Sequence, residues 1–412
     1  MRRQVVVTGV GAVTPIGLGA GGLYEGLRRE RSAIDRLTRF DAAPFNCRIA
    51  GEVRDFDPAA YMDARRLRRL DRYAQFAVAC ARMAFDDAAL DLTDENRDAI
   101  GCFVGSALGG GAFAEEQHAT FLSQGIRRIK PTLALAVFCG AASCNIAIEH
   151  DLRGPSSANS DSCASGAIAI GNAFRAVRDG YAEVMVAGGV EVPLAPLVFG
   201  AFDLIRAMST RNAEPAQACR PFDRGRDGFV MAEGAALLVL EEREHARRRG
   251  ARIYGTVGGY GNSNDAHHMT APLPSGAQAA RAMRDALAEA ELTPDQVDYV
   301  NAHASSTPLN DSAETLAIKQ VFGDRAHHIP VSGTKPMHGH ALGATGAIEA
   351  AICMLALRHG YIPPTLNLEH ADPACDLDYV AGKGREAAPR YVLSNSFGFG
   401  GINASLVFGR AS

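Results

Sequence analysis

The strongest constraint on how this chain can fold is an internal repeat. The segment Ala164–Tyr181, ASGAIAIGNAFRAVRDGY, aligns without gaps to Ala344–Tyr361, ATGAIEAAICMLALRHGY, and eight of the eighteen positions are identical. Both copies end in Gly-Tyr, and a glycine just past the last turn is typical of a helix C-terminus. Equivalent helices at an offset of 180 residues predict a duplicated fold with a pseudo-twofold axis.

The length of the chain agrees with two halves. A single hydrophobic core stops growing well below 412 residues, so two domains or two fused halves are expected. The joint is predicted near residues 247–255, RRRGARIYG, which gives an N-terminal half over 1–251 and a C-terminal half over 252–412.

Apolar runs alternate with helical patterns along both halves, which predicts an α/β fold with buried strands. Strands are predicted at Val5–Val10, Ile100–Val104, Val184–Gly188, Ala236–Glu241, Ile253–Tyr260, Val297–Asn301, Val392–Asn395 and Ala404–Phe408. Helices are predicted at Ala74–Leu90, Ala164–Arg178, Gln278–Ala290 and Ala344–Arg358.

The first repeated helix is preceded by a cysteine in the stretch SDSCASGAIAIG. Cys163 has only small neighbours, and a thiol at a helix start is expected to have a lowered pKa. A small core residue is the ordinary role of such a cysteine. The repeat, however, brings the starts of the two helices together near the pseudo-twofold axis. Cys163 is therefore predicted to approach His340 in HGHALG, which leads into the second helix.

Charge and cysteine usage exclude several classes of function. The formal net charge of −4 gives no overall attraction to nucleic acid or to anionic membranes. Nine scattered cysteines without a CxxC motif indicate reduced thiols in a cytoplasmic protein. The uncharged segment 131–148 contains Ser143 and Asn145, and it is predicted to be a buried helix rather than a membrane span.

Three further segments carry chemistry-bearing residues. His303 stands at the exit of a predicted strand in VDYVNAHASSTPLND. Lys335 and His340 belong to SGTKPMHGHALGATG. The strand-loop-strand SNSFGFGGINASLVF contains three glycines, which allow backbone N–H groups to approach a ligand closely.

With these motifs, the chain resembles elongation-type β-ketoacyl-acyl carrier protein synthases, which are condensing enzymes of the thiolase superfamily. It also resembles the ketosynthase subunits of type II polyketide synthases. The resemblance runs from VVVTGVGAVTPIG to FGFGGINASLVF and covers essentially the whole chain. It implies a thiolase-like duplicated fold, layered α-β-α-β-α, with two mixed sheets around a central helix pair.

The implied reaction is a decarboxylative Claisen condensation with malonyl-acyl carrier protein, in fatty-acid or type II polyketide or polyene elongation. Cys163 would carry the acyl chain as a thioester. His303 and His340 would assist malonyl decarboxylation and stabilise the enolate. Lys335 would brace the histidines within a network that includes Glu349.

The remaining site residues are also implied by the resemblance. Phe399 would gate the site, and its backbone N–H would join that of Cys163 as the oxyanion hole. Further substrate contacts are expected at Leu108, Thr270, Ser305, Thr307 and Gly398. No resident cofactor or metal is expected, because phosphopantetheine arrives on the carrier protein. The HGH motif at 338–340 lacks suitably spaced further ligands.

A basic run, DARRLRRLDR, is the candidate docking site for an acidic carrier protein. Arg65, Arg68, Arg69 and Arg72 follow the spacing of one helix face. A solvated helix face is the ordinary explanation of such a run. The family, however, docks its carrier protein on positions matching Arg65, Arg68 and Arg69, with Arg206 nearby. The expected assembly is a homodimer, or a heterodimer with a chain-length-factor-like subunit.

Some motifs depart from the family pattern. HASST stands in place of the usual HGTST, and KPMHGH in place of KSMTGH. These changes make a specialised polyketide or polyene pathway comparable to primary fatty-acid synthesis as an expectation. Two alternatives stay open. A chain-length-factor-type subunit would be expected to lack Cys163, and a coenzyme A thiolase would need a second catalytic cysteine where this chain has FGFGG.

Overall fold

The centre of the fold consists of the two repeated helices, α7 (Ser165–Arg178) and α13 (Thr345–His359). The computed structural model describes residues 3–93 and 96–411. The two helices contact each other reciprocally at small residues. A Cβ on Gly166 would lie 3.0 Å from Ala347 N, and a Cβ on Gly346 would lie 3.1 Å from Ala167 N. Because these positions correspond in the repeat, the crossing has the predicted pseudo-twofold symmetry.

The strands of the two halves have the same order and the same directions. The first half pairs in the order β6-β5-β7-β8-β1, and the second in the order β11-β10-β14-β15-β9. In each half the first two neighbouring pairs are parallel and the last two are antiparallel. The strands are β1 (Val5–Thr14), β5 (Ile100–Gly105), β6 (Ser156–Asn159), β7 (Val184–Glu191), β8 (Gly234–Glu242), β9 (Gly255–Asn264), β10 (Tyr299–Asn301), β11 (Val331–Ser332), β14 (Tyr391–Gly398) and β15 (Ile402–Arg410).

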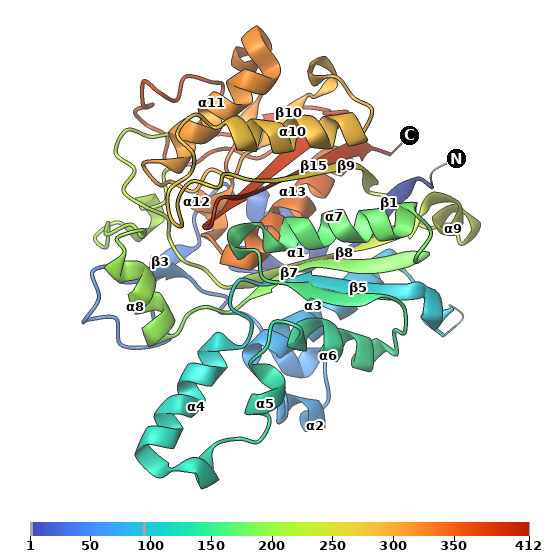
Figure 1. Cartoon of the computed structure of the whole chain (residues 1–412), viewed down its shortest axis with the longest axis vertical. Helices are drawn as coiled ribbons and strands as arrows, with labels where there is room; N and C mark the ends of the chain where they lie inside the picture. Colours follow the sequence, from blue (N-terminus) through green and yellow to red (C-terminus); the bar gives the residue numbers. More distant parts are fainter. Residues whose placement is uncertain (1–2, 94–95, 412) are drawn as a thin grey trace.

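These two arrays are the two mixed sheets of the predicted layered fold. They are joined at one point, where Val5–Val7 of β1 pair with Gly255–Val257 of β9. Helices α3 (Arg72–Ala88) and α6 (Ala141–His150) cover one outer face, and α10 (Ala277–Glu289) and α11 (Asn310–Phe322) cover the other (Figure 1). The layered α/β fold is thereby confirmed. The boundary between 1–251 and 252–412 stays a prediction, because the sheet is continuous across it.

Glycines in the first strand of each half let an outer helix approach closely. A Cβ on Gly11 of β1 would lie 2.0 Å from Cys80 O of α3. In the second half, a Cβ on Gly261 of β9 would lie 1.9 Å from Ala282 O of α10. Both distances are far inside van der Waals contact, so any side chain would push the helix away from the sheet. The duplication therefore extends to the packing of the outer layers.

The predicted strands and helices are all present, with ends shifted by a few residues. The sequence pattern missed the edge strands β6 and β11, which are short and partly polar. The other short strands are β2 (Gly17–Leu18), β3 (Ile34–Arg36), β4 (Ile49–Gly51), β12 (Tyr361–Ile362) and β13 (Arg385–Glu386). The remaining α-helices are α1 (Gly19–Arg28), α2 (Ala64–Leu67), α4 (Gly111–Gln124), α5 (Leu133–Ala136), α8 (Pro196–Leu204), α9 (Arg243–Arg248) and α12 (Lys335–His338).

The prediction of one buried helix over the uncharged segment 131–148 was wrong. The segment forms α5 and the start of α6, separated by a turn that ends at Gly140. Leu135, Val137 and Phe138 are exposed, because α4 and α5 project from the layered body (Figure 1). Ile148 of α6 is exposed as well. Within the described ranges, the structure contains no helix with the length and hydropathy that a bilayer crossing requires.

Candidate active site

Cys163 lies on a sharp turn that begins α7. Ser162, directly before it, has a φ of +53°, an unusual backbone conformation for a residue with a side chain. The turn 162–164 is a single 3-10 turn, and α7 follows at once. Cys163 is only 8% exposed, so its small neighbours do not leave the sulfur open to solvent. The sulfur instead faces an internal cavity.

That cavity has a volume of about 320 Å³ and unites residues from distant segments. It is lined by Cys163, His303 and His340, together with Phe399 from the glycine-rich loop. The predicted substrate contacts Thr270, Ser305, Thr307 and Gly398 line it as well. Leu108 does not line it. That side chain packs behind the wall, against the hydrophobic cluster that contains Cys163 and Leu342.

The two histidines face one another across the cavity. Their ring centroids are 5.4 Å apart and the rings are nearly perpendicular. Nδ1 of His340 lies 2.8 Å from the hydroxyl of Thr345, which leaves Nε2 for the cavity. Burial, and next the charge of Lys335, hold the pKa of both imidazoles well below its usual value. Both rings are therefore neutral at pH 7, and each has one N–H donor.

Lys335 is fully buried beneath the histidines. Its ammonium group bonds the backbone carbonyl oxygen of His303 and lies 2.7 Å from Oε1 of Glu349, the partner expected from the sequence. Burial raises the pKa of Glu349 to about 7, although the neighbouring ammonium opposes that rise. The lysine thus ties the strand-exit loop of His303 to the central helix α13.

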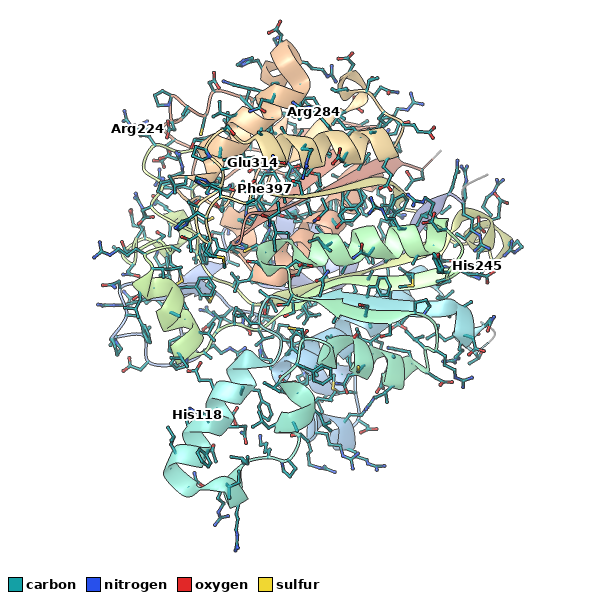
Figure 2. The ribbon with its side chains drawn as sticks, viewed as in Figure 1. His118, Arg224, His245, Arg284, Glu314 and Phe397 are labelled. Carbon is teal, nitrogen blue, oxygen red and sulfur yellow. The ribbon has the colours of Figure 1, made fainter. Side chains whose placement is uncertain are left out.

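A residue that the sequence interpretation missed holds the other side of the His303 loop. Glu314 of α11 is buried, and its carboxylate accepts the backbone N–H groups of His303 and Ala304, both at 2.8 Å. Asn395 of β14 also donates to it, at 3.2 Å. Figure 2 labels Glu314 and Phe397. The ring centroid of Phe397 is 5.9 Å from that of His303. From the sequence alone, no feature distinguishes Glu314 from an ordinary acidic residue on a helix.

The glycine-rich loop brings a backbone donor to the cysteine. The N–H of Phe399 points to the Cys163 thiol, and the Phe399 ring stacks on Phe202 with centroids 6.2 Å apart. A Cβ on Gly398 would lie 3.1 Å from Cys163 N. Without a side chain there, the N–H groups of Cys163 and Phe399 are accessible at one end of the cavity.

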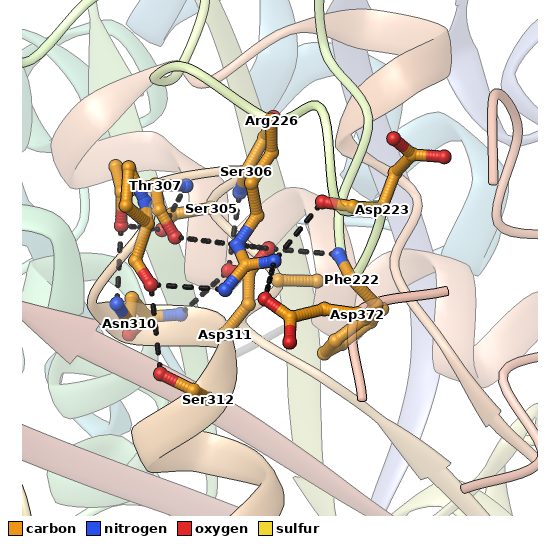
Figure 3. Close-up of polar contacts among 12 residues, drawn as sticks. Phe222, Asp223, Arg226, Ser305, Ser306, Thr307, Asn310, Asp311, Ser312 and Asp372 are labelled. Carbon is orange, nitrogen blue, oxygen red and sulfur yellow. Dashed lines mark hydrogen bonds and ion pairs between the residues drawn. The ribbon is translucent and has the colours of Figure 1, made fainter. Parts of the chain in front are cut away.

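Arg226 forms hydrogen bonds with the loop that carries Ser305 and Thr307 (Figure 3). The Arg226 guanidinium donates to the backbone oxygens of Thr307 and Pro308, at 3.1 and 2.9 Å. Asp311 accepts the backbone N–H of Ser306 at 3.2 Å. The Ser305 and Thr307 hydroxyls, 2.8 Å apart, are consequently fixed at the cavity wall.

The expected lowering of the Cys163 pKa was wrong. Burial raises the pKa of the thiol to about 11, although the Ser162 hydroxyl, the Lys335 charge and the Phe399 N–H each oppose the rise. Desolvation outweighs the helix dipole because the sulfur is enclosed within the protein. The free protein therefore holds a thiol rather than a thiolate at pH 7.

The four arginines of the basic run, Arg65, Arg68, Arg69 and Arg72, do not lie on one continuous helix. Asp63 caps α2 and Asp71 caps α3, so the predicted single helix is broken and Arg72 instead binds Glu233. The groove beside Arg68 and Arg69 extends to the start of α8. Arg206 follows the end of α8 and lines the mouth of the cavity.

The raised thiol pKa has a measurable consequence. Because a thiol with a pKa of about 11 is almost wholly protonated at pH 7, its reactive fraction grows about tenfold with each pH unit. We expect alkylation of Cys163 by iodoacetamide, followed by intact mass, to rise about tenfold per unit between pH 7 and pH 9. A rate that levels off below pH 8 would instead show a stabilised thiolate.

Comparison with known proteins agrees with this geometry. The family models of the β-ketoacyl synthase N-terminal and C-terminal domains match residues 2–246 and 254–369. A 3-oxoacyl-[acyl-carrier-protein] synthase 2 of Synechocystis sp. is 46% identical over 407 residues, which are 99% of this chain and 98% of that protein.

Solved structures also cover the whole chain. One is a type II polyketide synthase ketosynthase in complex with its acyl-carrier protein and bound to the hexaketide, with a TM-score of 0.93, 35% identity and full coverage of both chains. Another is the ishigamide ketosynthase/chain length factor, with a TM-score of 0.94, 36% identity and full coverage of both chains. The chain therefore belongs to the β-ketoacyl synthase family of condensing enzymes.

Proposed function

We propose that this chain elongates carrier-bound acyl groups, with Cys163 as the nucleophile and His303 and His340 as the groups that act on the malonyl unit. The observation that carries the proposal is the shared cavity of these three residues, with the Phe399 N–H directed at the sulfur. The remaining roles follow from the charges and donors around that cavity.

The first half-reaction transfers the acyl chain to the cysteine. The Cys163 sulfur attacks the carbonyl of the incoming acyl thioester, the bond to the carrier's pantetheine sulfur breaks, and the thiol proton passes to that leaving sulfur. A neutral imidazole in the same cavity can relay the proton, because its unprotonated nitrogen is a base. The N–H groups of Cys163 and Phe399 stabilise the oxyanion.

In the second half-reaction, the malonyl thioester loses its carboxylate as CO₂, and the negative charge moves to the thioester oxygen. The N–H donors of the neutral His303 and His340 hold that enolate oxygen. The enolate carbon then bonds to the acyl carbonyl, the bond to Cys163 breaks, and the departing thiolate takes up one proton from solvent. The Ser305 and Thr307 hydroxyls serve the pantetheine arm.

The proposed partners are an acyl carrier protein and a second subunit. Arg65, Arg68 and Arg69 are exposed, and no ion pair is recorded for them among residues 3–93 and 96–411. The solved ketosynthase bound to its carrier protein supports this kind of partner.

Nine free thiols support the cytoplasm as the compartment. The proposed pathway is fatty-acid or type II polyketide chain elongation.

The second subunit is proposed to cover the edge strand β6 and exposed apolar side chains between α4 and α6. Among the described residues, strand β6 pairs only with β5, and unpaired edges of this kind favour association. The exposed apolar side chains of segment 121–148 are Phe121, Leu122, Ile126, Leu135, Val137, Phe138 and Ile148. Large exposed apolar side chains in such number favour an interface. The solved ketosynthase/chain length factor supports either a second copy or a related chain as the partner.

We expect light scattering at micromolar concentration to give the mass of two 43.5 kDa chains. The exposed apolar patch and the free edge strand are the physical reason. A stable, active monomer would contradict this expectation, whereas a monomer that gains activity only with a related chain would identify the heterodimer.

Charge reversal at Arg65, Arg68 and Arg69 should raise the KM for carrier-bound substrate about tenfold and leave small thioester mimics unaffected, because exposed charges act mainly on encounter. The effect should weaken at high salt. Arg248→Glu, at another exposed arginine, is the matched control. Equal losses with both substrate types would mean that the patch is structural.

Separate assays of the half-reactions test the roles in the cavity. Cys163→Gln should abolish acyl loading, measured by intact mass, yet retain CO₂ release from malonyl-carrier protein. His303→Ala should keep loading and lose decarboxylation by about 10²–10³-fold, as for one removed oxyanion donor. Loss of both activities in folded His303→Ala would make His303 the base that activates the thiol.

A further inference from the structure

The duplicated fold contains the cysteine turn twice. Cys163 corresponds in the repeat to Gly343, and Ser162 corresponds to Leu342. Leu342 has a φ of +39°, so both turns have a residue with a side chain in the left-handed region. Both turns are followed by a central helix. The second turn is thus a complete copy of the first, with glycine at the position of the nucleophile.

The two turns differ in what faces their backbone N–H. Strand β14 ends at Gly398, which has no side chain and lies against Cys163 N. The equivalent strand β7 ends at Glu191, and its Oε2 accepts the N–H of Gly343 at 3.0 Å. In the first turn, the N–H of Cys163 is accessible to a substrate oxygen. In the second turn, the equivalent N–H of Gly343 is bonded to the carboxylate of Glu191.

Glu191 also binds the loop that backs the cavity. Its oxygens accept the N–H groups of Ala107 at 2.6 Å and Leu108 at 3.2 Å, and the hydroxyl of Ser106 at 3.1 Å. The side chain is 0% exposed, and no cation pairs with it among the described residues. Burial raises the pKa of Glu191 to about 7, against the pull of these donors.

This carboxylate therefore joins two parts of the cavity wall. Ala107 and Leu108 pack against the cluster that holds Cys163 and Leu342, and Leu342 lines the cavity itself. Ala107 O in turn accepts the hydroxyl of Ser160, in the segment that leads to the cysteine turn. A shift of the 106–108 loop would therefore displace both the segment that carries Cys163 and the cavity wall at Leu342.

We propose that Glu191 is a positioning residue for acyl loading: its carboxylate fills the amide site of the second turn and fixes the 106–108 loop against Cys163 and Leu342. The inference rests on the proposed role of Cys163 as the acyl acceptor. Glu191 does not contact the reacting atoms. It sets the shape of the wall that the acyl chain meets.

The direct test is chemical rescue of Glu191→Ala. Removing the carboxylate leaves a small anion site with three N–H donors, and formate fits such a space. We expect the acylation rate of Cys163, followed by intact mass, to fall at least about tenfold, and sodium formate to restore most of it. Sodium chloride at the same ionic strength should restore none.

Glu241→Ala is the matched control. Glu241 is equally buried, but its carboxylate binds Arg249, His245 and Thr8, away from the cavity. That variant should lose stability without a formate-dependent change in acylation. A folded Glu191→Ala protein that formate does not rescue, or equal rescue of both variants, would overturn the proposal.

Glu191→Gln decides the question if the alanine variant does not fold. The amide oxygen can accept some of the backbone N–H groups, but the amide NH₂ would face other N–H donors and cannot bond to them. The 106–108 loop would therefore lose some of its hydrogen bonds. We expect acylation to slow more for long acyl chains than for short ones. An unchanged chain-length profile would overturn the inference. If wild-type protein takes no acyl group at Cys163, the proposed function itself fails, and the two results are distinguishable.

Discussion

The architecture depends on one contact, the close crossing of α7 and α13 at small residues. Gly166 and Gly346 let the two helices approach until backbone atoms of one meet side chains of the other. Because these glycines lie in the first turn of each helix, the crossing also brings the two preceding turns together. Cys163 and His340, 177 residues apart in the sequence, meet in one cavity as a result. A single larger side chain at the crossing would separate them.

One buried cation, Lys335, influences the protonation of the histidines that line the cavity. Lys335 pairs with Glu349 and bonds the loop of His303, and its charge adds to burial in keeping both imidazoles neutral. Neutral rings can donate N–H bonds to an enolate, and they can also accept a thiol proton. Burial meanwhile keeps the cysteine protonated. At pH 7, Cys163, His303 and His340 are thus all uncharged. In the reaction that we propose for them, charge develops only as bonds form and break.

The sequence predicted the elements and residues that repeat or that carry strong chemical motifs. The 180-residue repeat predicted the central helices, and apolar runs predicted the long buried strands. The pattern failed where tertiary contacts decide. The uncharged segment 131–148 was taken for one buried helix, although Leu135, Val137, Phe138 and Ile148 within it are exposed. The carboxylates of Glu314 and Glu191 accept backbone N–H groups of loops outside their own helix or strand, and no local pattern marks such a contact. The pKa of Cys163 depends mainly on the burial of its sulfur. The small residues that flank Cys163 in the sequence gave no sign of that burial.

We propose that one cavity first holds an acyl group on Cys163 and then extends it. The most direct measurement is a single turnover followed by mass spectrometry, with acyl-carrier protein added first and malonyl-carrier protein second. We predict an acyl group on the peptide that contains Cys163, and then its disappearance as a β-ketoacyl-carrier protein and CO₂ form in equal amounts. A condensation product formed without acylation of Cys163, or acylation at another residue, would contradict the account.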